Sequence, residues 1–267
     1  MESRAAVTTI YRIPDSLWAE MAPIIEIAMP SRSVRGRQRP DMRPIVDAVL
    51  LRMRTGAQWR TLERKSSLHR WFQALNKSGA WEALWMLMVD EAAKQGKVDE
   101  SKVFLDGNIT KSPMGERLTG PSPVHRSRLG SKRSVMTDGQ GYPISICLSG
   151  ANTPDSRMLD ETLASRIVRM SNIDLVMDKG YRGRPVLEVC ERHGFMRILP
   201  PARREPGDQR PTSPVDPRQK GRWKVERTFA WLHAFRGLEH RYERKPENHL
   251  GLLHLWAAIV WWRRLQT

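Results

Sequence analysis

Two aspartates stand at the ends of short apolar segments. Asp106 follows Val103-Phe104-Leu105, and Asp178 follows Leu175-Val176-Met177. A carboxylate at the end of a buried strand lies at the carboxyl edge of its sheet, where open α/β sheets bind their ligands. If the two strands are neighbours, we expect the two carboxylates to converge. Each aspartate also precedes a glycine-containing turn, so turn formation is the alternative for either residue alone.

A third acid, Glu226, lies in an amphipathic segment. Val225, Phe229 and Leu232 recur at helical spacing and predict the buried stripe of a helix. Glu226 lies at the flank of this stripe, so we expect it to lean over a sheet edge. An ordinary ion pair with Arg222, one helical turn earlier, is the alternative.

The composition is that of a folded, strongly basic protein. The 267 residues include 45 Lys+Arg and 29 Asp+Glu, a formal net charge of +16, and the 10 tryptophans exclude a disordered basic tail. The density of basic residues rises toward the C-terminus, which indicates a polyanionic partner, with a solvated basic surface as the alternative.

The cysteine content indicates a reducing compartment, and the hydropathy indicates no membrane span. The only two cysteines, Cys147 and Cys190, are too few for a disulfide framework. The longest apolar run, Leu250 to Trp262, is shorter than the ~20 residues that span a bilayer, and we read it as a buried helix. We therefore expect a cytoplasmic protein with no membrane partner.

Residues 1–97 have helical periodicity throughout. Helices are expected from about Asp15, over 43–54, and from about Ser66 and Gly79. Between the first two lies Ser31 to Pro40, a loop with four arginines and no acid, which is the composition of a phosphate-contacting arm. Several short helices suit a helix-turn-helix-like DNA-binding module, although helical bundles that bind nothing look the same.

Residues 98–267 change to strand periodicity. We expect strands at 102–106, 134–137, 142–148, 173–178 and 195–199, and helices at about 155–170, 185–193, 222–235 and 247–265. The segment Asp138-Gly139-Gln140-Gly141 is typical of a hairpin turn. An early antiparallel hairpin followed by crossover helices predicts an α/β fold, in which helices cover both faces of a mixed five-stranded sheet.

Three ordered motifs carry a family resemblance. They are Leu105-Asp106-Gly107, Met177-Asp178-Lys179-Gly180-Tyr181 and Arg222-x3-Glu226-Arg227-x-Phe229-Ala230-Trp231-Leu232. Together they resemble the Asp-Asp-Glu (DDE) transposases of bacterial insertion sequences, most closely the insertion sequence five family. Further matches are Thr55-Gly56-x2-Trp59-Arg60, Thr119-Gly120-Pro121-Ser122-Pro123, Gly130-Ser131-Lys132, Leu148-Ser149-Gly150-Ala151-Asn152 with Asp155, and Arg241-Tyr242-Glu243.

The resemblance implies an RNase H-like catalytic domain over 98–267, preceded by a small all-α domain over 1–97. It also implies that Asp106, Asp178 and Glu226 are the catalytic residues and hold two Mg²⁺ or Mn²⁺ ions. Hard oxygen ligands suit Mg²⁺, and two ions activate the attacking oxygen and stabilise the leaving oxygen of a phosphodiester. The expected reaction is cleavage at the ends of the element, followed by transfer of the 3′-OH into target DNA. A catalytically silent DNA-binding regulator and a nuclease without strand transfer are the alternatives.

The expected partner is double-stranded DNA, both the terminal inverted repeats and the target. Strand transfer joins two ends, so we expect a homodimer or larger assembly on DNA, associated with the bacterial nucleoid when bound. The candidate DNA-binding residues are Arg35, Arg37, Arg39, Lys132, Arg133, Lys179, Arg182, Arg222, Lys224 and Arg227. Such basic side chains give mostly sequence-independent, salt-sensitive affinity. We expect Trp223 and Trp231 to be core residues, with stacking on an unpaired base as the alternative.

Overall fold

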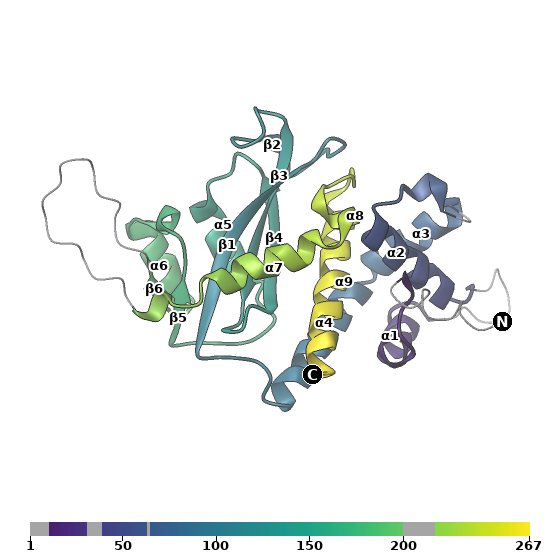
Figure 1. Cartoon of the computed structure of the whole chain (residues 1–267), viewed down its shortest axis with the longest axis horizontal. Helices are drawn as coiled ribbons and strands as arrows, with labels where there is room; N and C mark the ends of the chain where they lie inside the picture. The colour runs from purple at the N-terminus through teal and green to yellow at the C-terminus, as the bar shows by residue number, and fades with distance from the viewer. Residues whose placement is uncertain (1–10, 31–38, 63–64, 200–216) are drawn as a thin grey trace, which may run out of the picture.

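A helical N-terminal region precedes a mixed α/β region in the computed structural model (Figure 1), which describes residues 11–30, 39–62, 65–199 and 217–267. The loop residues Arg35 and Arg37 lie outside the described residues. Within these limits the sheet is mixed and flanked by helices, so the predicted fold class is confirmed.

The N-terminal region consists of short helices with buried apolar stripes. Its elements are α1 (Asp15–Ala28), α2 (Arg43–Thr55), the 3-10 turn η2 (Trp59–Thr61), α3 (Lys65–Lys77) and α4 (Ala80–Lys94). A proline in the first turn of α2 suits the unbonded N–H groups there, and Gly56, with φ of 74°, ends the helix in the left-handed conformation. The expected helix starts are therefore confirmed.

The sheet has β1 at its centre. Its strands are β1 (Lys102–Lys111), β2 (Gly120–Pro121), β3 (Leu129–Thr137), β4 (Pro143–Gly150), β5 (Ile173–Val176) and β6 (Phe195–Ile198). The order is β2-β3-β1-β5-β6, and β4 also pairs with β3. The β1–β3 and β3–β4 pairs are antiparallel, whereas β1–β5 and β5–β6 are parallel.

The sheet differs from the expectation at several points, among them that β3 begins at Leu129 rather than at Ser134 and that β5 ends at Val176 rather than at Asp178. The first strand continues past Gly107 to Lys111, because its second half pairs with β3, so Asp106 lies within the strand and not at its end. The two-residue strand β2 adds a sixth member. Gly107 is suited to its place, since a Cβ atom there would collide with the side chain of Asp155.

Helices cover both faces of the sheet. They are α5 (Asp155–Ala164), α6 (Arg184–Arg192), α7 (Trp223–His233), α8 (Arg236–Glu239) and α9 (Pro246–Leu265). Helix α7 crosses one face over β1 and β3, whereas α5 lies on the other face over β3 and β4 (Figure 1). The expected helix over 155–170 ends earlier, at Ala164.

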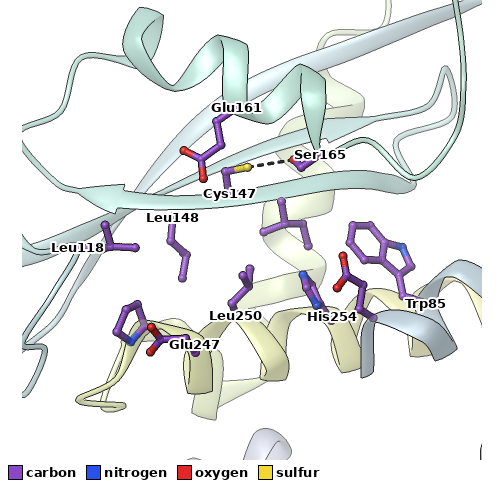
Figure 2. A pocket seen from close by; sticks show the side chains of 12 residues that line it. Trp85, Leu118, Cys147, Leu148, Glu161, Ser165, Glu247, Leu250 and His254 are labelled. Atoms are coloured by element: carbon purple, nitrogen blue, oxygen red, sulfur yellow. Dashed lines mark hydrogen bonds between the residues drawn. The ribbon is translucent and has the colours of Figure 1, made fainter. Parts of the chain in front are cut away.

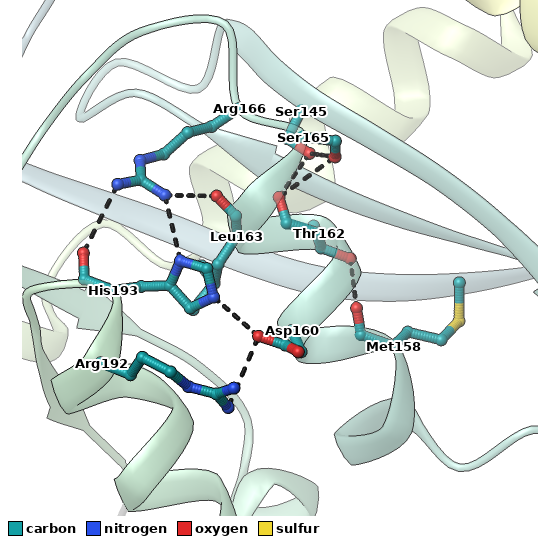
Figure 3. Close-up of polar contacts among 9 residues, drawn as sticks. All are labelled: Ser145, Met158, Asp160, Thr162, Leu163, Ser165, Arg166, Arg192 and His193. Atoms are coloured by element: carbon teal, nitrogen blue, oxygen red, sulfur yellow. Dashed lines mark hydrogen bonds and ion pairs between the residues drawn. The ribbon is translucent and has the colours of Figure 1, made fainter.

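A polar network joins the end of α6 to α5 (Figure 3). His193 Nε2 lies 2.7 Å from Asp160 Oδ1, and Arg192 lies 3.6 Å from the same carboxylate oxygen. On the other side of the ring, Arg166 reaches His193 Nδ1 at 3.4 Å. The hydrogen bond with His193 lowers the pKa of Asp160, so its carboxylate stays charged between the two helices.

The N-terminal and C-terminal tryptophans meet in one apolar core. Helices α4 and α9 lie side by side (Figure 1), and Trp85 and Trp261 both donate their indole N–H to the carbonyl of Pro143, at 3.2 and 2.7 Å. Trp81 and Trp256 are buried in the same cluster. No helix in the described part of the chain, α9 included, is long and apolar enough to cross a membrane.

A buried ion pair fastens α2 to the segment before α9. Arg52 pairs with Glu243, each side chain only 5% exposed, and Trp59 Nε1 donates to the same carboxylate at 3.1 Å. Burial lowers the pKa of Arg52, and the charge of Glu243 opposes this. These contacts join two segments that are far apart in the sequence.

We expect Glu243→Ala to lower the free energy of unfolding by about 3–5 kcal/mol, because it leaves the buried Arg52 charge without a counter-ion. The matched control is Glu116→Ala, which removes the exposed Arg244–Glu116 pair and should cost less than about 1 kcal/mol. Urea denaturation of the full chain measures both. Equal small losses would show that the buried pair does not hold the two segments together.

Candidate active site

The structure brings Asp106 and Asp178 together at the carboxylate edge, the place where β5 ends and β1 continues without it. Strands β1 and β5 run parallel and pair as far as Phe104 opposite Val176. Each aspartate lies two residues further along its chain, so both side chains emerge together. The guanidinium of Arg222 bridges them, with Nη2 3.4 Å from Asp106 Oδ2 and Nη1 3.5 Å from Asp178 Oδ1.

Backbone N–H groups donate to both carboxylates, and burial acts on Asp106. Asp106 accepts a hydrogen bond from Gly107 N at 2.8 Å, and Asp178 accepts one from Lys179 N at 2.7 Å. Burial raises the pKa of Asp106, and the charge of Asp178 adds to the rise, whereas Gly107 and Arg222 oppose it. The site therefore favours a cation between the two carboxylates.

Glu226 is not gathered with the two aspartates. Helix α7 buries Val225 and Phe229, and the Glu226 side chain is exposed, with no hydrogen bond or ion pair to any described residue. The alternative pair with Arg222 is also absent, since Arg222 turns to the aspartates. Among the described residues no three Asp, Glu, His or Cys side chains are grouped closely enough to hold a metal ion.

The hairpin turn between β3 and β4 positions α7. Thr228 Oγ1 donates to the carbonyl of Gly141, Lys224 Nζ to that of Gly139, and Arg227 to that of Gln140. The turn is itself ordered by Asp138, which accepts hydrogen bonds from the backbone N–H groups of residues 140 and 142. The expectation that Asp138 forms this turn is confirmed.

Lys132 and Arg133 are not DNA-facing residues, and this part of the prediction is wrong. Both lie in β3, between β1 and β4, and both are buried. Lys132 Nζ donates to the carbonyl of Thr153 at 2.7 Å and pairs with Asp155 at 3.0 Å. Arg133 Nη1 donates to the carbonyl of Leu238 at 2.7 Å, and burial lowers its pKa to about 9.

Arg39 also binds partners within the protein. Its guanidinium pairs with Glu26 and donates to the carbonyls of Ile25 and Met29 at the end of α1. The side chain is 16% exposed and already has partners within the protein, so the predicted phosphate contact stays a prediction. The carbonyls at a helix C-terminus attract a cation, which explains its position.

The remaining basic candidates surround the carboxylate edge. Lys179 and Arg182 are exposed next to Asp178, and Lys224 and Arg227 are partly exposed on α7. Trp223 is 56% exposed, with the Arg227 guanidinium 5.0 Å from its ring, so the core reading is wrong for this tryptophan. Trp231 is partly buried and packs against Tyr142 at 5.4 Å.

Several motif residues build the fold, a role that the sequence did not reveal. Arg241 is buried and donates to Leu118 O at 3.0 Å and Ser131 Oγ at 2.8 Å. A Cβ atom on Gly120 would collide with the Asn152 side chain. The motifs around 119–123, 130–132, 148–152 and 241–243 therefore meet in space. Their glycines and their lack of helical periodicity were the available signal for close packing.

A separate cavity of about 240 Å³ lies between β4, α5 and α9 (Figure 2). Cys147, Leu148, Leu250 and His254 line it, and no predicted site residue does. Burial raises the pKa of Cys147 and lowers that of His254 to about 4. Both groups are therefore neutral, and neither is an activated nucleophile or base at neutral pH.

Comparison with known proteins assigns the chain to a family. Residues 99–262 match the model described as "Transposase DDE domain", and residues 13–85 match "Putative transposase of IS4/5 family". The "Putative transposase for insertion sequence element IS402" of Burkholderia cepacia is 32% identical over 160 residues, which cover 57% of this chain and 72% of that protein.

Solved structures with a remote likeness include "Crystal structure of the Mos1 Strand Transfer Complex" and "Mos1 transposase paired-end complex with left transposon end". Their TM-scores are 0.34 and 0.31, each at 11% identity over 88% of this chain and 81% of theirs. Likeness of this degree does not define which residues correspond.

The mixed sheet and the family match define the class of protein, a transposase with a DDE domain. The chain belongs to the DDE transposases of bacterial insertion sequences and is a DNA transposase. The resemblance drawn from its three acidic motifs is thereby confirmed at the level of the family.

We expect Gly141→Ala to destabilise the protein by about 3 kcal/mol, because Gly141 has φ of 89° and an added Cβ would lie 2.8 Å from Lys224 O on α7. Gly96→Ala is the matched control. Gly96 also has a positive φ, 66°, but nothing lies within 4 Å of an added Cβ, so only about 1 kcal/mol of backbone strain is expected. Thermal and urea unfolding measure the difference. If both variants lose the same stability, the turn does not position α7.

Proposed function

We propose that this transposase cleaves DNA at the ends of its insertion sequence and joins the freed 3′-OH to target DNA. Asp106, Asp178 and Glu226 are its metal-holding carboxylates in this proposal. The observation that carries it is the cation-bridged pair Asp106–Asp178 at the carboxylate edge.

The residues present fit a divalent metal. Carboxylate oxygens are the ligands that Mg²⁺ and Mn²⁺ prefer, and the two aspartates already hold a positive group between them. Glu226 lies apart from the two aspartates in the structure, so α7 would have to move for Glu226 to supply the third carboxylate. Two bound metal ions would activate the attacking oxygen and stabilise the leaving oxygen of the phosphodiester.

The chain's own residues hold and orient the DNA. Lys179, Arg182 and Lys224 surround the carboxylate edge and contact the phosphate backbone, and Arg222 and Arg227 join them when DNA is bound. Trp223 offers an exposed indole face for an unpaired base. Arg35 and Arg37, outside the described residues, remain proposed phosphate contacts.

The same proposal covers the domains of the protein, its assembly on DNA and its location. Residues 1–97 form the DNA-binding domain and residues 98–267 the catalytic domain, a division supported by family matches on either side of residue 97. Two ends must be joined, so the protein works as a dimer or larger assembly on DNA. Its substrate, the chromosome, places the reaction in the bacterial cytoplasm.

Cleavage and strand transfer test the proposal. With Mg²⁺ and a duplex carrying the inverted repeats that flank the gene, the full chain should give cut ends and joined products. We expect a loss of cleavage activity of about a hundredfold or more in each of three variants, Asp106→Asn, Asp178→Asn and Glu226→Gln. Mutation of residues that only support metal ligands already lowers activity or metal affinity by about 10–100-fold. Asp174→Asn is the matched control. Asp174 lies in β5, the strand that leads to Asp178, but it pairs with Arg218 and not with Arg222.

The outcomes separate the alternatives. Cleavage without joined products indicates a nuclease, and binding of the ends without cleavage indicates a silent regulator. Full activity in the three carboxylate variants would show that the catalytic residues lie elsewhere.

Salt dependence tests the DNA contacts separately. We expect Lys179→Gln to reduce the slope of log affinity against log salt concentration by about one, because it removes one phosphate contact. Lys94→Gln, whose ammonium group is paired with Asp90 and Glu91 on α4, should leave the slope unchanged. Fluorescence anisotropy with a labelled duplex measures both slopes. An unchanged slope for Lys179→Gln would remove this residue from the DNA interface.

A further inference from the structure

Arg222 has a place in the site that its sequence motif does not explain. Its guanidinium lies between the two carboxylates proposed as metal ligands, at 3.4 and 3.5 Å. Charge-assisted hydrogen bonds between guanidinium and carboxylate groups are usually about 2.7–2.9 Å long. The bridge is therefore loose, and Nε of the same group is buried without a hydrogen-bond partner among the described residues.

The backbone next to Arg222 packs closely against β1, whereas the Arg222 side chain makes only long contacts. Gly221, in the left-handed region with φ of 97°, packs against Phe104 of β1, and an added Cβ would lie 3.1 Å from that ring. Arg222 then occupies the N-cap position of α7, without a capping hydrogen bond from its side chain. Its side chain is 32% exposed, so the guanidinium reaches both the carboxylates and the solvent side of the edge.

The neighbouring basic residues do not share this role. Lys224 and Arg227 donate to the carbonyls of the turn at 139–141, and Arg227 also lies over the Trp231 ring at 4.7 Å. Neither has an ion pair with Asp106 or Asp178 within the described part of the chain. Of Arg222, Lys224 and Arg227, only Arg222 contacts the two carboxylates in that part of the chain.

We propose that Arg222 is an internal counter-ion that couples DNA binding to metal binding. Without DNA its guanidinium offsets one of the two negative charges of Asp106 and Asp178 and competes with a divalent cation for them. When DNA binds, a backbone phosphate takes the guanidinium, because a phosphate oxygen pair matches its donors as well as the carboxylates do. The carboxylates are then released for metal.

The coupling is reciprocal. If DNA raises the metal affinity by removing Arg222, then metal raises the DNA affinity by the same factor, because it frees the guanidinium for phosphate. The consequence is that the metal site is completed only where DNA is present, which limits chemistry at the site in the free protein. This inference rests on the proposed metal role of Asp106 and Asp178.

Mn²⁺ binding to the full chain tests the proposal without any measurement of activity. Free Mn²⁺ is followed by electron paramagnetic resonance, with and without a short random-sequence duplex, and the Mn²⁺ bound by the duplex alone is subtracted. Without DNA, Arg222→Gln should bind Mn²⁺ at least about fivefold more tightly than the unaltered protein, at the lower end of typical coupling between sites. Addition of duplex should tighten Mn²⁺ binding in the unaltered protein and have much less effect in Arg222→Gln.

Two further variants make the result decisive. Arg222→Lys keeps the charge but cannot bridge both carboxylates, so its Mn²⁺ affinity should fall between the two. Arg218→Gln is the matched control, since it removes an arginine that pairs with Asp174 at 3.4 Å at the other end of β5, and its Mn²⁺ affinity should be unchanged. Circular dichroism checks that each variant is folded.

The failures are distinguishable. If Asp106→Asn and Asp178→Asn bind Mn²⁺ as well as the unaltered protein does, the proposed metal site and the coupling are both wrong. If these two variants lose Mn²⁺ but Arg222→Gln gains no affinity, or gains as little as Arg218→Gln, the coupling alone is wrong and the metal site stands.

Discussion

Two negative charges placed side by side are the constraint on which the rest of the site depends. The parallel register of β1 and β5 carries Asp106 and Asp178 to the same edge, and carboxylates so close need a compensating cation. In the structure Arg222 supplies it, and the start of α7 is fixed where this is possible, by Gly221 against Phe104. The sheet register, the helix position and the electrostatics of the edge are thus parts of one arrangement.

Much of the excess basic charge has a structural use. Arg52, Arg133 and Arg241 are buried, and each donates hydrogen bonds to backbone carbonyls or to a carboxylate. A buried charged group depends on hydrogen bonds within the protein, so these side chains hold segments together and are not part of the basic surface. The net charge of +16 therefore overstates the basic surface, and the exposed candidates gather around the carboxylate edge.

The helical and α/β regions share a core although they match separate family models. Helices α4 and α9 bury tryptophans from both ends of the chain, and the Arg52–Glu243 pair adds a polar connection. A DNA molecule held by the N-terminal helices would therefore have a defined position relative to the carboxylates. In the proposed reaction, this connection orients the element's end at the site.

Sequence periodicity and motif order determined much of this protein. The helix starts, the hairpin at Asp138, the mixed sheet and the transposase family were predictable, because they depend on residues close together in the chain or on their order along it. Glycines at turns and apolar repeats act locally, so their effect can be read without knowledge of the partner segments.

Only the tertiary structure decided which charged residues face outward. Basic side chains are typical DNA contacts, yet three of the candidates bind partners within the protein: Lys132, Arg133 and Arg39. Arg222 turned from its helical neighbour Glu226 to two aspartates more than forty residues away. Burial and ion pairing depend on which distant segments pack together, and a side chain's chemical type is the same in either setting.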